Sequence, residues 1–327
     1  MPPVLRGTVV CALAFAVLAA SAVAARAQNY PSKPVRFVIG FSPGGPSDIL
    51  TRLVGSKLAE GLGQPFVFDN RPGAGGNIAG EITAKSPPDG YTILMGNNSI
   101  LATNAALYKN MGFDPVKDLD PVALIASQPN ILVVHPSVPV KTVRELIAFA
   151  KARPGQLNYA SSGSGAAAHL AAELFKSMTG VQMTHVPYKG AAPALTDVLA
   201  GQCQLIFATS LSVQPYIKSG RLRALAVTTA KRARANPELP TVAEAGVPGF
   251  EANTWHGIVV TARTPAAITA RLNSEVNKVL HRPEVRERIE GLGGEIIGGT
   301  QQQFAAYIQS EIPKWTKVVK ESGARAE

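Results

Sequence analysis

The chain has 327 residues, of which 46% are hydrophobic and 17% are charged, and its formal net charge is +10. This composition is that of a folded globular protein and excludes a disordered or fibrous chain. The length suits two domains or one large domain. The positive charges are scattered, and the densest cluster, at residues 231–234, has no interleaved aromatic residues. We therefore expect no nucleic-acid-binding surface.

Residues 1–27 differ in composition from the rest of the chain. Arg6 is the only charge before an apolar run over residues 9–25, which ends in the small-residue patterns AVA (22–24) and ARA (25–27). These features predict a secretory signal peptide, cleaved after Ala27, and a mature protein in the periplasm. An uncleaved membrane anchor is the alternative, but the apolar segment is short and rich in alanine. Removal of Arg6 and Arg26 would lower the net charge from +10 to about +8.

The two cysteines do not predict a disulfide. Cys11 lies inside the predicted signal peptide, and the residues before it do not form a lipobox. Cleavage would leave Cys203 alone, so an intramolecular disulfide would be impossible even in an oxidising compartment.

Short β-rich runs alternate with helical patterns along the chain, which is typical of an α/β architecture with largely parallel strands. In the first part of the chain, strands are predicted at 35–41, 66–69, 91–96, 122–126 and 131–134, with Gln128-Pro129-Asn130 interrupting the last two. Residues 49–58 have the apolar spacing of a helix. The later predicted elements are helix 142–152, strand 157–160, helix 166–178, strand 183–186, helix 193–199, and strands 205–208, 223–228 and 255–261.

Two signals mark helices near the C-terminus. Thr264 followed by Pro265 predicts the start of one helix. Thr300 with Gln303 predicts a capping box for the last helix.

The order of these elements indicates two lobes. Irregular proline-rich stretches at 127–130 and 236–250 separate two groups of βα units. We predict that 28–127 and 252–327 form lobe 1, that 128–251 form lobe 2, and that the C-terminal helices pack on lobe 1. This is the layout of a binding protein with a ligand cleft between two lobes.

Two catalytic motifs are missing from the sequence. It contains no G-x-x-x-x-G-K-[ST] and no S-x-x-K. None of the five histidines stands in H-E-x-x-H or beside a cysteine, so we expect no metal site. His169 and Glu173, one helical turn apart, are interpreted as a surface or core-edge pair. An exported hydrolase using Ser164 and His169 is an alternative hypothesis, although these two residues do not share a helical face.

The segment 163–168 satisfies G-x-G-x-x-[GA], follows a predicted strand and opens a predicted helix. A dinucleotide-binding fold would place an acidic residue at the end of the next strand to hold the ribose. That region reads VPYKG instead, at 186–190. We therefore expect no cofactor.

Two glycine-rich turns between a strand and a helix have the pattern of anion-binding loops, GFSPGGPSD at 40–48 and SSGSGA at 161–166. Such turns offer unpaired backbone N–H groups and the positive end of a helix dipole, which suit a carboxylate or a phosphate. Gly44 and Gly45 would allow close approach of a ligand. Ser47 or Asp48 is expected to cap the helix, and Asp48 either caps only or also contacts the ligand. Each turn alone is ordinary in an α/β protein, but two from opposite lobes would hold the two ends of a small dicarboxylate.

Two further polar segments are candidates. The glycine-rich turn at 71–77 is interpreted as structural. Asn97-Asn98-Ser99 follows a predicted strand, where α/β sheets place ligands. Its amides would either bond a ligand or form a turn.

Six segments, in this order, resemble the Bug family of extracytoplasmic solute-binding receptors of tripartite tricarboxylate transporters: PSKPVRFVIGFSPGGPSD, FDNRPGAGGNIAGE, SPPDGYTILMGN, GSGAAAHL, VPYKGAAPALTDVLAG and LPTVAEAGVPGFE. The resemblance covers essentially the whole mature chain. It implies a two-lobed type II periplasmic-binding-protein fold that captures a small carboxylate and delivers it to membrane permease subunits. We expect a monomer. A ligand-sensing partner of a membrane signalling receptor is the alternative role.

The resemblance also implies ligand contacts. They fall on Phe41, Ser42, Pro43, Gly44, Gly45, Ser47 and Asp48 in the first loop and on Ser162, Gly163, Ser164, Gly165 and Ala166 in the second. Thr209 and Ser210 are added by the same resemblance, and Asn97 and Asn98 are the candidates from strand position. The chain departs from the family at GQCQ, 201–204, and at His256, where members more often carry an aromatic residue. Because family members differ in what fills the far end of the cleft, the identity of the ligand does not transfer.

Overall fold

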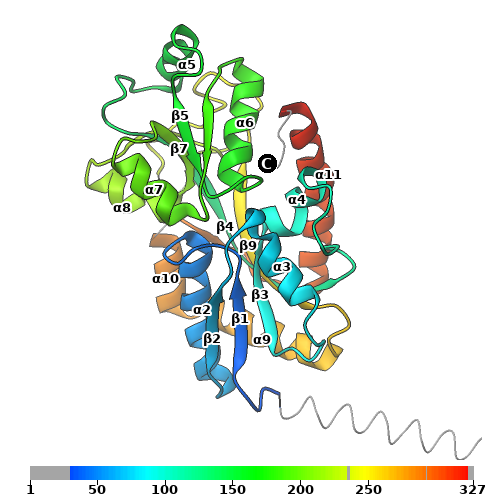
Figure 1. Cartoon of the computed structure of the whole chain (residues 1–327). Helices are drawn as coiled ribbons and strands as arrows, with labels where there is room; N and C mark the ends of the chain where they lie inside the picture. Colours follow the sequence, from blue (N-terminus) through cyan, green and yellow to red (C-terminus); the bar gives the residue numbers. More distant parts are fainter. Residues whose placement is uncertain (1–29, 234–235, 292, 323–327) are drawn as a thin grey trace, which may run out of the picture.

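The computed structural model describes residues 30–233, 236–291 and 293–322, so the predicted signal peptide lies outside the described residues. In this part of the chain a ten-stranded mixed sheet runs through two lobes with helices on its faces (Figure 1). The sheet follows the order β2-β1-β3-β9-β4-β7-β5-β6, and β8 and β10 also pair with β4. None of the helices in these ranges is both long and apolar enough to cross a membrane.

Lobe 1 is built around β1, which pairs in parallel with β2 and β3, while β9 pairs antiparallel with β3 and β4. Its strands are near-continuous apolar runs, as expected where helices cover both faces of a sheet. The strands are β1 (Val35–Ile39), β2 (Phe66–Asn70), β3 (Thr92–Asn97), β9 (Asn253–Thr261) and β10 (Glu295–Ile296). The helices are α2 (Pro46–Leu62), the 3-10 turn η1 (Ala74–Gly76), α3 (Asn77–Ala84), the π-helical turn η2 (Ser99–Thr103), α4 (Asn104–Leu107), α9 (Ala266–Leu280), α10 (Pro283–Gly291) and α11 (Gln301–Ser322).

In lobe 2, as in lobe 1, a central strand pairs in parallel with two neighbours: β5 lies between β6 and β7. Strands β7 and β8 pair antiparallel with the second part of β4. The strands are β5 (Asn158–Ser161), β6 (Thr184–Pro187), β7 (Leu205–Thr209) and β8 (Arg223–Val227), and the helices are α5 (Val143–Ala152), α6 (Ala167–Thr179), α7 (Ala191–Leu199) and α8 (Ser210–Lys218).

One strand, β4 (Leu119–Val134), passes through both lobes for 16 residues. The prediction of two strands interrupted at Gln128-Pro129-Asn130 is wrong. Pro129 lacks an N–H, but it stands where β4 changes partners, opposite Asn253 at the beginning of β9 and just before Asn130 pairs with β7. The chain returns to lobe 1 between β8 and β9. The exact residue boundaries of the lobes stay a prediction.

Helix α8 was not predicted, because Pro215 lies inside it and serines occupy its first turn. The predicted capping box of the last helix is confirmed, since the Thr300 N–H donates to Gln303 and the Gln303 N–H donates to the Thr300 hydroxyl. The predicted cap at Thr264 is wrong. Its hydroxyl donates to the Thr261 carbonyl, and Pro265 occupies the N-cap of α9.

The C-terminal helices do not all pack on lobe 1. Helices α9 and α10 lie against α2, as predicted, but α11 contacts η2 and α4 of lobe 1 and also α6 of lobe 2 (Figure 1). Trp315 and Val319 of α11 belong to the same apolar cluster as Leu174 and Phe175 of α6. This extended apolar face explains why α11 spans the lobes.

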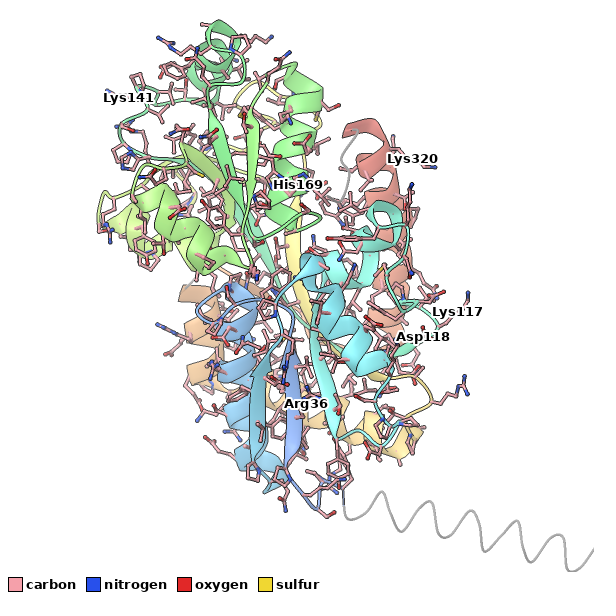
Figure 2. The ribbon with its side chains drawn as sticks, in the orientation of Figure 1. Arg36, Lys117, Asp118, Lys141, His169 and Lys320 are labelled. Atoms are coloured by element: carbon pink, nitrogen blue, oxygen red, sulfur yellow. The ribbon has the colours of Figure 1, made fainter. Side chains whose placement is uncertain are left out.

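The charged side chains lie mainly outside. Lys117, Lys141 and Lys320 project from the periphery, whereas His169 lies inside the molecule, next to the region where the lobes meet (Figure 2).

Candidate functional site

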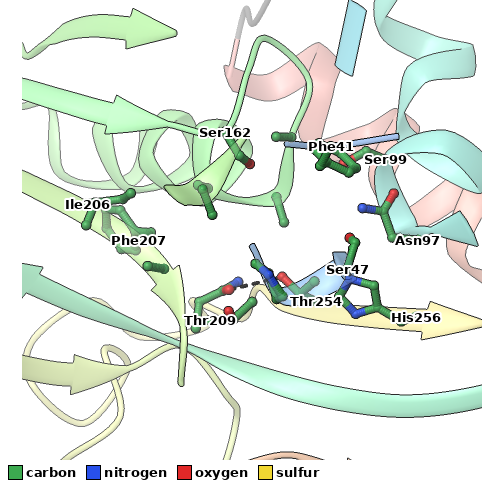
Figure 3. Close-up of a pocket in the computed structure, with 17 residues that line it drawn as sticks. Phe41, Ser47, Asn97, Ser99, Ser162, Ile206, Phe207, Thr209, Thr254 and His256 are labelled. Atoms are coloured by element: carbon green, nitrogen blue, oxygen red, sulfur yellow. Dashed lines mark hydrogen bonds between the residues drawn. The ribbon is translucent and has the colours of Figure 1, made fainter. Parts of the chain in front are cut away.

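A cavity lies between the lobes, where the carboxyl ends of β3 and β7 meet β4 and β9 (Figure 3). The centre of a water-sized sphere can occupy about 40 Å³ of it, which is room for roughly three waters. Its lining residues are Phe41, Pro46, Ser47, Asn97, Ser99, Asn130, Ser162, Ala166, Ala167, Ala168, Ala191, Ile206, Phe207, Ala208, Thr209, Thr254 and His256.

The lobes are closed over this cavity. The Ser42 N–H of lobe 1 donates to the Lys189 carbonyl of lobe 2 at 3.2 Å. On another side of the cleft, the Tyr108 hydroxyl donates to the Ser164 carbonyl at 3.0 Å. A ligand of several carbon atoms would enter only after these contacts separate, as in hinge closure around a ligand.

The first predicted loop is only partly at the cavity. Phe41 and Ser47 line it, whereas Ser42, Pro43, Gly44, Gly45 and Asp48 do not. Neither Ser47 nor Asp48 occupies the N-cap, which is Gly45 with Pro46 as the first helical residue. The prediction that Ser47 or Asp48 caps this helix is wrong. The Ser47 hydroxyl lies 2.9 Å from His256 Nε2 instead.

Asp48, in the first turn of α2, fixes the glycine-rich loop that precedes this helix. It is 3% exposed, and its carboxylate accepts from the Gly44 N–H, from Arg52 Nε and from Asn70 Nδ2, each at 3.0 Å. Burial raises the pKa of this carboxyl. The hydrogen bonds from Arg52, Gly44 and Asn70 lower the pKa by a larger amount, so that it lies below its ordinary value. The Gly44 N–H predicted to meet a ligand is therefore occupied by the protein itself.

The second predicted loop is also divided. Ser162 and Ala166 line the cavity. Gly163 and Ser164 line a neighbouring hollow beside Gly75 and Lys189. Gly165 lines neither, and its N–H donates to His169 Nδ1 at 3.1 Å.

Two stacked histidines lie behind the second loop. The rings of His169 and His185 are 4.1 Å apart, and His185 Nε2 meets the Ser161 hydroxyl at 2.6 Å. Burial lowers the pKa of His169 to about 4 and that of His185 to about 3, so both rings are neutral at neutral pH. His169 Nδ1 accepts from Gly165, and no hydrogen bond joins it to Ser164 among the described residues. This geometry does not favour the hydrolase hypothesis.

Other predicted residues have mixed positions. Asn97 and Thr209 line the cavity. Asn98 and Ser210 are buried outside its lining, and the Asn98 amide and Ser210 hydroxyl have no partner in the described structure. The metal expectation can be tested only within the described ranges, where no three histidine, cysteine or acidic side chains are grouped closely enough to hold an ion.

Several lining residues were missed by the sequence analysis. They are Pro46, Ser99, Asn130, Ala167, Ala168, Ala191, Ile206, Phe207, Ala208, Thr254 and His256. Ser99 was the nearest to a prediction, since it follows the two asparagines after β3. His256 was noted only as a departure from a family pattern, although its register with Asn97 across β3 and β9 places it in the site.

Four helices begin at the cavity. Ser47 lies in the first turn of α2, Ala167 and Ala168 open α6, Ala191 opens α7, and Thr209 is the N-cap of α8. The first N–H groups of a helix lack partners within it, and the helix dipole adds partial positive charge there. None of the described residues that line the cavity carries a charged side chain. The site is therefore positive through backbone dipoles alone, which suits a small anion.

The fold and the closed interlobe cavity define a two-lobed solute-binding protein of the periplasmic type. The model of the tripartite tricarboxylate transporter family receptor matches residues 50–324. The chain belongs to this family of periplasmic receptors, and its function is that of a solute-binding receptor for a tripartite transporter.

Relatives of known sequence or structure agree. The chain is 36% identical over 312 residues to the protein BugT of Bordetella pertussis, covering 95% of this chain and 96% of the relative. It is 42% identical to Rpa4515 of R. palustris, solved with adipate, with a TM-score of 0.89 over 91% of this chain and 100% of the other. It is 31% identical to MatC of Rhodopseudomonas palustris, solved with bound malate, with a TM-score of 0.86 over 89% of this chain and 100% of the other. The predicted type II fold and the family assignment are confirmed.

Proposed function

We propose that this receptor captures a small metabolite through a carboxylate in the interlobe cavity and performs no covalent chemistry on it. The observation that carries the proposal is the convergence of four helix N-termini on a closed cavity without charged side chains. An anion bound there would be held by backbone N–H groups and by neutral side-chain donors. Because the fold holds these donors in place, little conformational entropy would be lost when the anion binds.

The relatives support a carboxylate over other anions. Rpa4515 was solved with adipate and MatC with malate, and both share this fold over about nine-tenths of the chain. A planar carboxylate accepts from two or three N–H or O–H donors at once, which the cavity wall offers through Asn97, Ser99 and Ser162. We propose that Phe41, Ser47, Asn97, Ser162, Ala166 and Thr209 are the ligand-contacting part of the predicted set, and that Ser99 joins them.

The setting of this function follows from the N-terminal sequence. The hydrophobic segment over residues 9–25 supports export and cleavage, so we propose that the mature chain acts in the periplasm. We also propose that it acts as a monomer. The scattered positive charges support the proposal that it does not bind nucleic acid. The closed form would then dock on the membrane permease subunits of the transporter and release the ligand to them.

Isothermal titration calorimetry of the mature chain, residues 28–327, tests the proposal. The panel would contain mono-, di- and tricarboxylates, with the corresponding primary amides as uncharged controls of the same shape. We expect at least one carboxylate to bind and its amide to bind at least tenfold more weakly. Equal binding of acid and amide, or no binding across the panel, would contradict the proposed carboxylate site.

A further inference from the structure

The turn 163–165 of lobe 2 lies directly against lobe 1. It precedes α6, and both α6 and the lobe 1 helix α4 contact α11 (Figure 1). The hydroxyl of Tyr108, the residue that ends α4, donates to the Ser164 carbonyl of this turn at 3.0 Å. On either side of the turn, Ser162 and Ala166 line the ligand cavity. One short loop therefore contacts both the cavity and the opposite lobe.

The contact brings two backbones close together, and glycine makes this possible. A Cβ on Gly75 of lobe 1 would lie 2.7 Å from the Ser164 carbonyl oxygen. A Cβ on Gly165 of lobe 2 would lie 2.5 Å from Leu107 Cδ2 and 2.6 Å from Asn104 Oδ1. Both glycines have positive φ angles, +61° and +83°. A side chain at either position would hold the lobes apart.

The lobe 1 surface of this contact is held by bonds within lobe 1. Asn104 is fully buried, and its Nδ2 donates to the Gly75 carbonyl at 3.1 Å and to Asn77 Oδ1 at 2.7 Å. Leu107 belongs to the same apolar cluster as Ala166 of lobe 2. Lobe 1 therefore presents a formed recess to the turn.

The lobe 2 surface is held in the same way. The Ser161 hydroxyl accepts from the Gly163 N–H at 3.1 Å, and His169 Nδ1 accepts from the Gly165 N–H at 3.1 Å. His185, whose ring stacks on that of His169, lies with its Nε2 2.6 Å from the Ser161 hydroxyl. Because both surfaces are fixed before they meet, little conformational entropy is lost when the lobes close.

Two hydrogen bonds join the lobes on different sides of the cleft. One joins Tyr108 to Ser164, and the other joins the Ser42 N–H to the Lys189 carbonyl at 3.2 Å. Both bonds break when the lobes separate, so a weaker first bond should make the second open more often. Neither Tyr108 nor Gly165 lines the cavity, so a change at either residue alters closure without removing a cavity side chain.

We propose that the contact of Asn104, Leu107 and Tyr108 with residues 163–165, here called the cleft latch, holds the closed form and sets the rate at which ligand leaves. A ligand between the lobes can leave only while the latch is open. Loss of the Tyr108–Ser164 hydrogen bond should favour the open form by about 2- to 10-fold, the effect of one hydrogen bond. The effect on ligand release rests on the proposed function, whereas the effect on lobe opening does not.

Hydrogen exchange of the Ser42 N–H tests the latch, first without ligand and then with an excess of adipate. This N–H loses its Lys189 partner only when the lobes separate, so its exchange rate reports opening. Tyr108→Phe keeps the ring and should raise the rate at least twofold in one of the two conditions. Tyr91→Phe is the matched control, because its hydroxyl contacts Ser32 within lobe 1, and it should leave the rate unchanged.

Two results would overturn the inference. One is an unchanged Ser42 exchange rate in Tyr108→Phe under both conditions. The other is a parent protein whose Ser42 N–H exchanges at its unprotected rate under both conditions, because no latch would then hold the lobes together.

Gly165→Ala tests the same contact sterically. Its added Cβ should raise the Ser42 exchange rate and weaken binding of any acid in the carboxylate panel at least tenfold, while the circular dichroism spectrum is unchanged. Gly155→Ala is the control, since Gly155 has a similar φ of +74° but no atom within 4 Å of an added Cβ. Parent-like exchange and affinity in Gly165→Ala would contradict the latch.

The latch and the proposed function can fail separately. A panel in which no acid binds, together with a Ser42 rate that responds to Tyr108→Phe, would remove the proposed function and keep the latch. Acids that bind as proposed, together with a Ser42 rate that ignores both Tyr108→Phe and Gly165→Ala, would remove the latch and keep the function.

Discussion

Asp48 and His256 are both buried polar side chains near the start of the cleft, but their polar atoms have different partners. All the hydrogen bonds of Asp48 go to groups of the protein, namely Gly44, Arg52 and Asn70. His256 has one nitrogen on Ser47 and the other without a partner in the described structure. The first pattern fixes a loop, and the second leaves one buried ring nitrogen without a partner among the described residues.

Asp48→Asn should therefore lower stability more than affinity. The amide cannot accept from Gly44, Arg52 and Asn70 together, and the loss should reduce the free energy of unfolding by about 1–2 kcal/mol. Urea denaturation at pH 7 measures the stability, and calorimetry should show an affinity within threefold of the parent. Because the folded state lowers the pKa of Asp48, its contribution is present above the unfolded value near 3.8 and is lost as the pH falls below it. A stability difference that does not shrink as the pH falls below 3.8 would contradict this account.

At the residue scale, the sequence located the loops but not the whole site. Glycine and proline spacing marks both glycine-rich turns, because those residues adopt turn conformations that others avoid. The partner of Ser47, however, lies 209 residues away, and only the register of β9 with β3 brings His256 there. Such long-range pairing leaves no local signal in one sequence.

Secondary-structure elements meet across the cleft at Gly190, the N-cap of α7. Its φ is +153°, and a Cβ there would lie 2.9 Å from the Ser42 backbone nitrogen of the opposite lobe. Gly190→Ala should push these loops apart, break the Ser42–Lys189 hydrogen bond and weaken ligand binding at least tenfold, as measured by calorimetry. Gly180→Ala is the control, since Gly180 has a φ of +69° at the end of α6 but no atom within 4 Å of an added Cβ. Equal affinity of the two variants would show that closure does not depend on this contact.

The last helix is joined to the sheet by a buried carboxylate. Glu311 Oε2 accepts from the indole N–H groups of Trp255 on β9 and Trp315 on α11, each at 2.8 Å. Glu311→Ala would leave two buried donors without a partner and should lower the free energy of unfolding by about 2–5 kcal/mol. Glu311→Gln keeps an acceptor oxygen and should cost less than half as much in the same denaturation experiment. Equal losses for the two variants would mean that packing, not the hydrogen bonds, is the source of stability.

At the element scale, strands were easier to predict than their continuity. The alternation of apolar runs and helical patterns identified the α/β class, since each type has its own period. The sequence analysis predicted two strands in place of the single strand β4, because a proline such as Pro129 ordinarily ends a central strand. The change of partners at this point, which makes the proline tolerable, is a property of the sheet and not of the segment.

The molecule as a whole consists of two lobes that strand β4 and helix α11 join. Neutral histidines are buried on both sides of the cleft, His256 in lobe 1 and the stacked pair His169 and His185 in lobe 2. Burial lowers the pKa of each of these rings, to about 3, about 4 and about 3 respectively. In the unfolded chain the same side chains titrate near the ordinary histidine pKa of 6.5. The folded protein therefore binds fewer protons than the unfolded chain between these values.

This difference makes the fold sensitive to acid. Above about pH 7.5 the histidines are neutral in both states and have almost no effect. As the pH falls from about 6.5 toward 4, the unfolded state takes up protons that the folded state refuses, and the free energy of unfolding drops by about 1.4 kcal/mol per pH unit for each fully buried ring. His256, His169 and His185 together should give a slope of about 4 kcal/mol per pH unit around pH 5, because the folded-state pKa of each ring lies at least about one unit below that pH.

Urea denaturation at half-unit steps from pH 7.5 to pH 4.5 measures this slope. His256→Phe and His169→Gln each remove one titrating ring and should each flatten it by about 1.4 kcal/mol per pH unit. His281→Gln is the control, because His281 lies exposed at the end of α9. The lowered pKa of Asp48 acts near and below its unfolded value of 3.8, so the range from pH 6.5 to pH 5 isolates the histidines. If neither substitution changes the slope in that range, acid acts on the fold through groups other than these histidines.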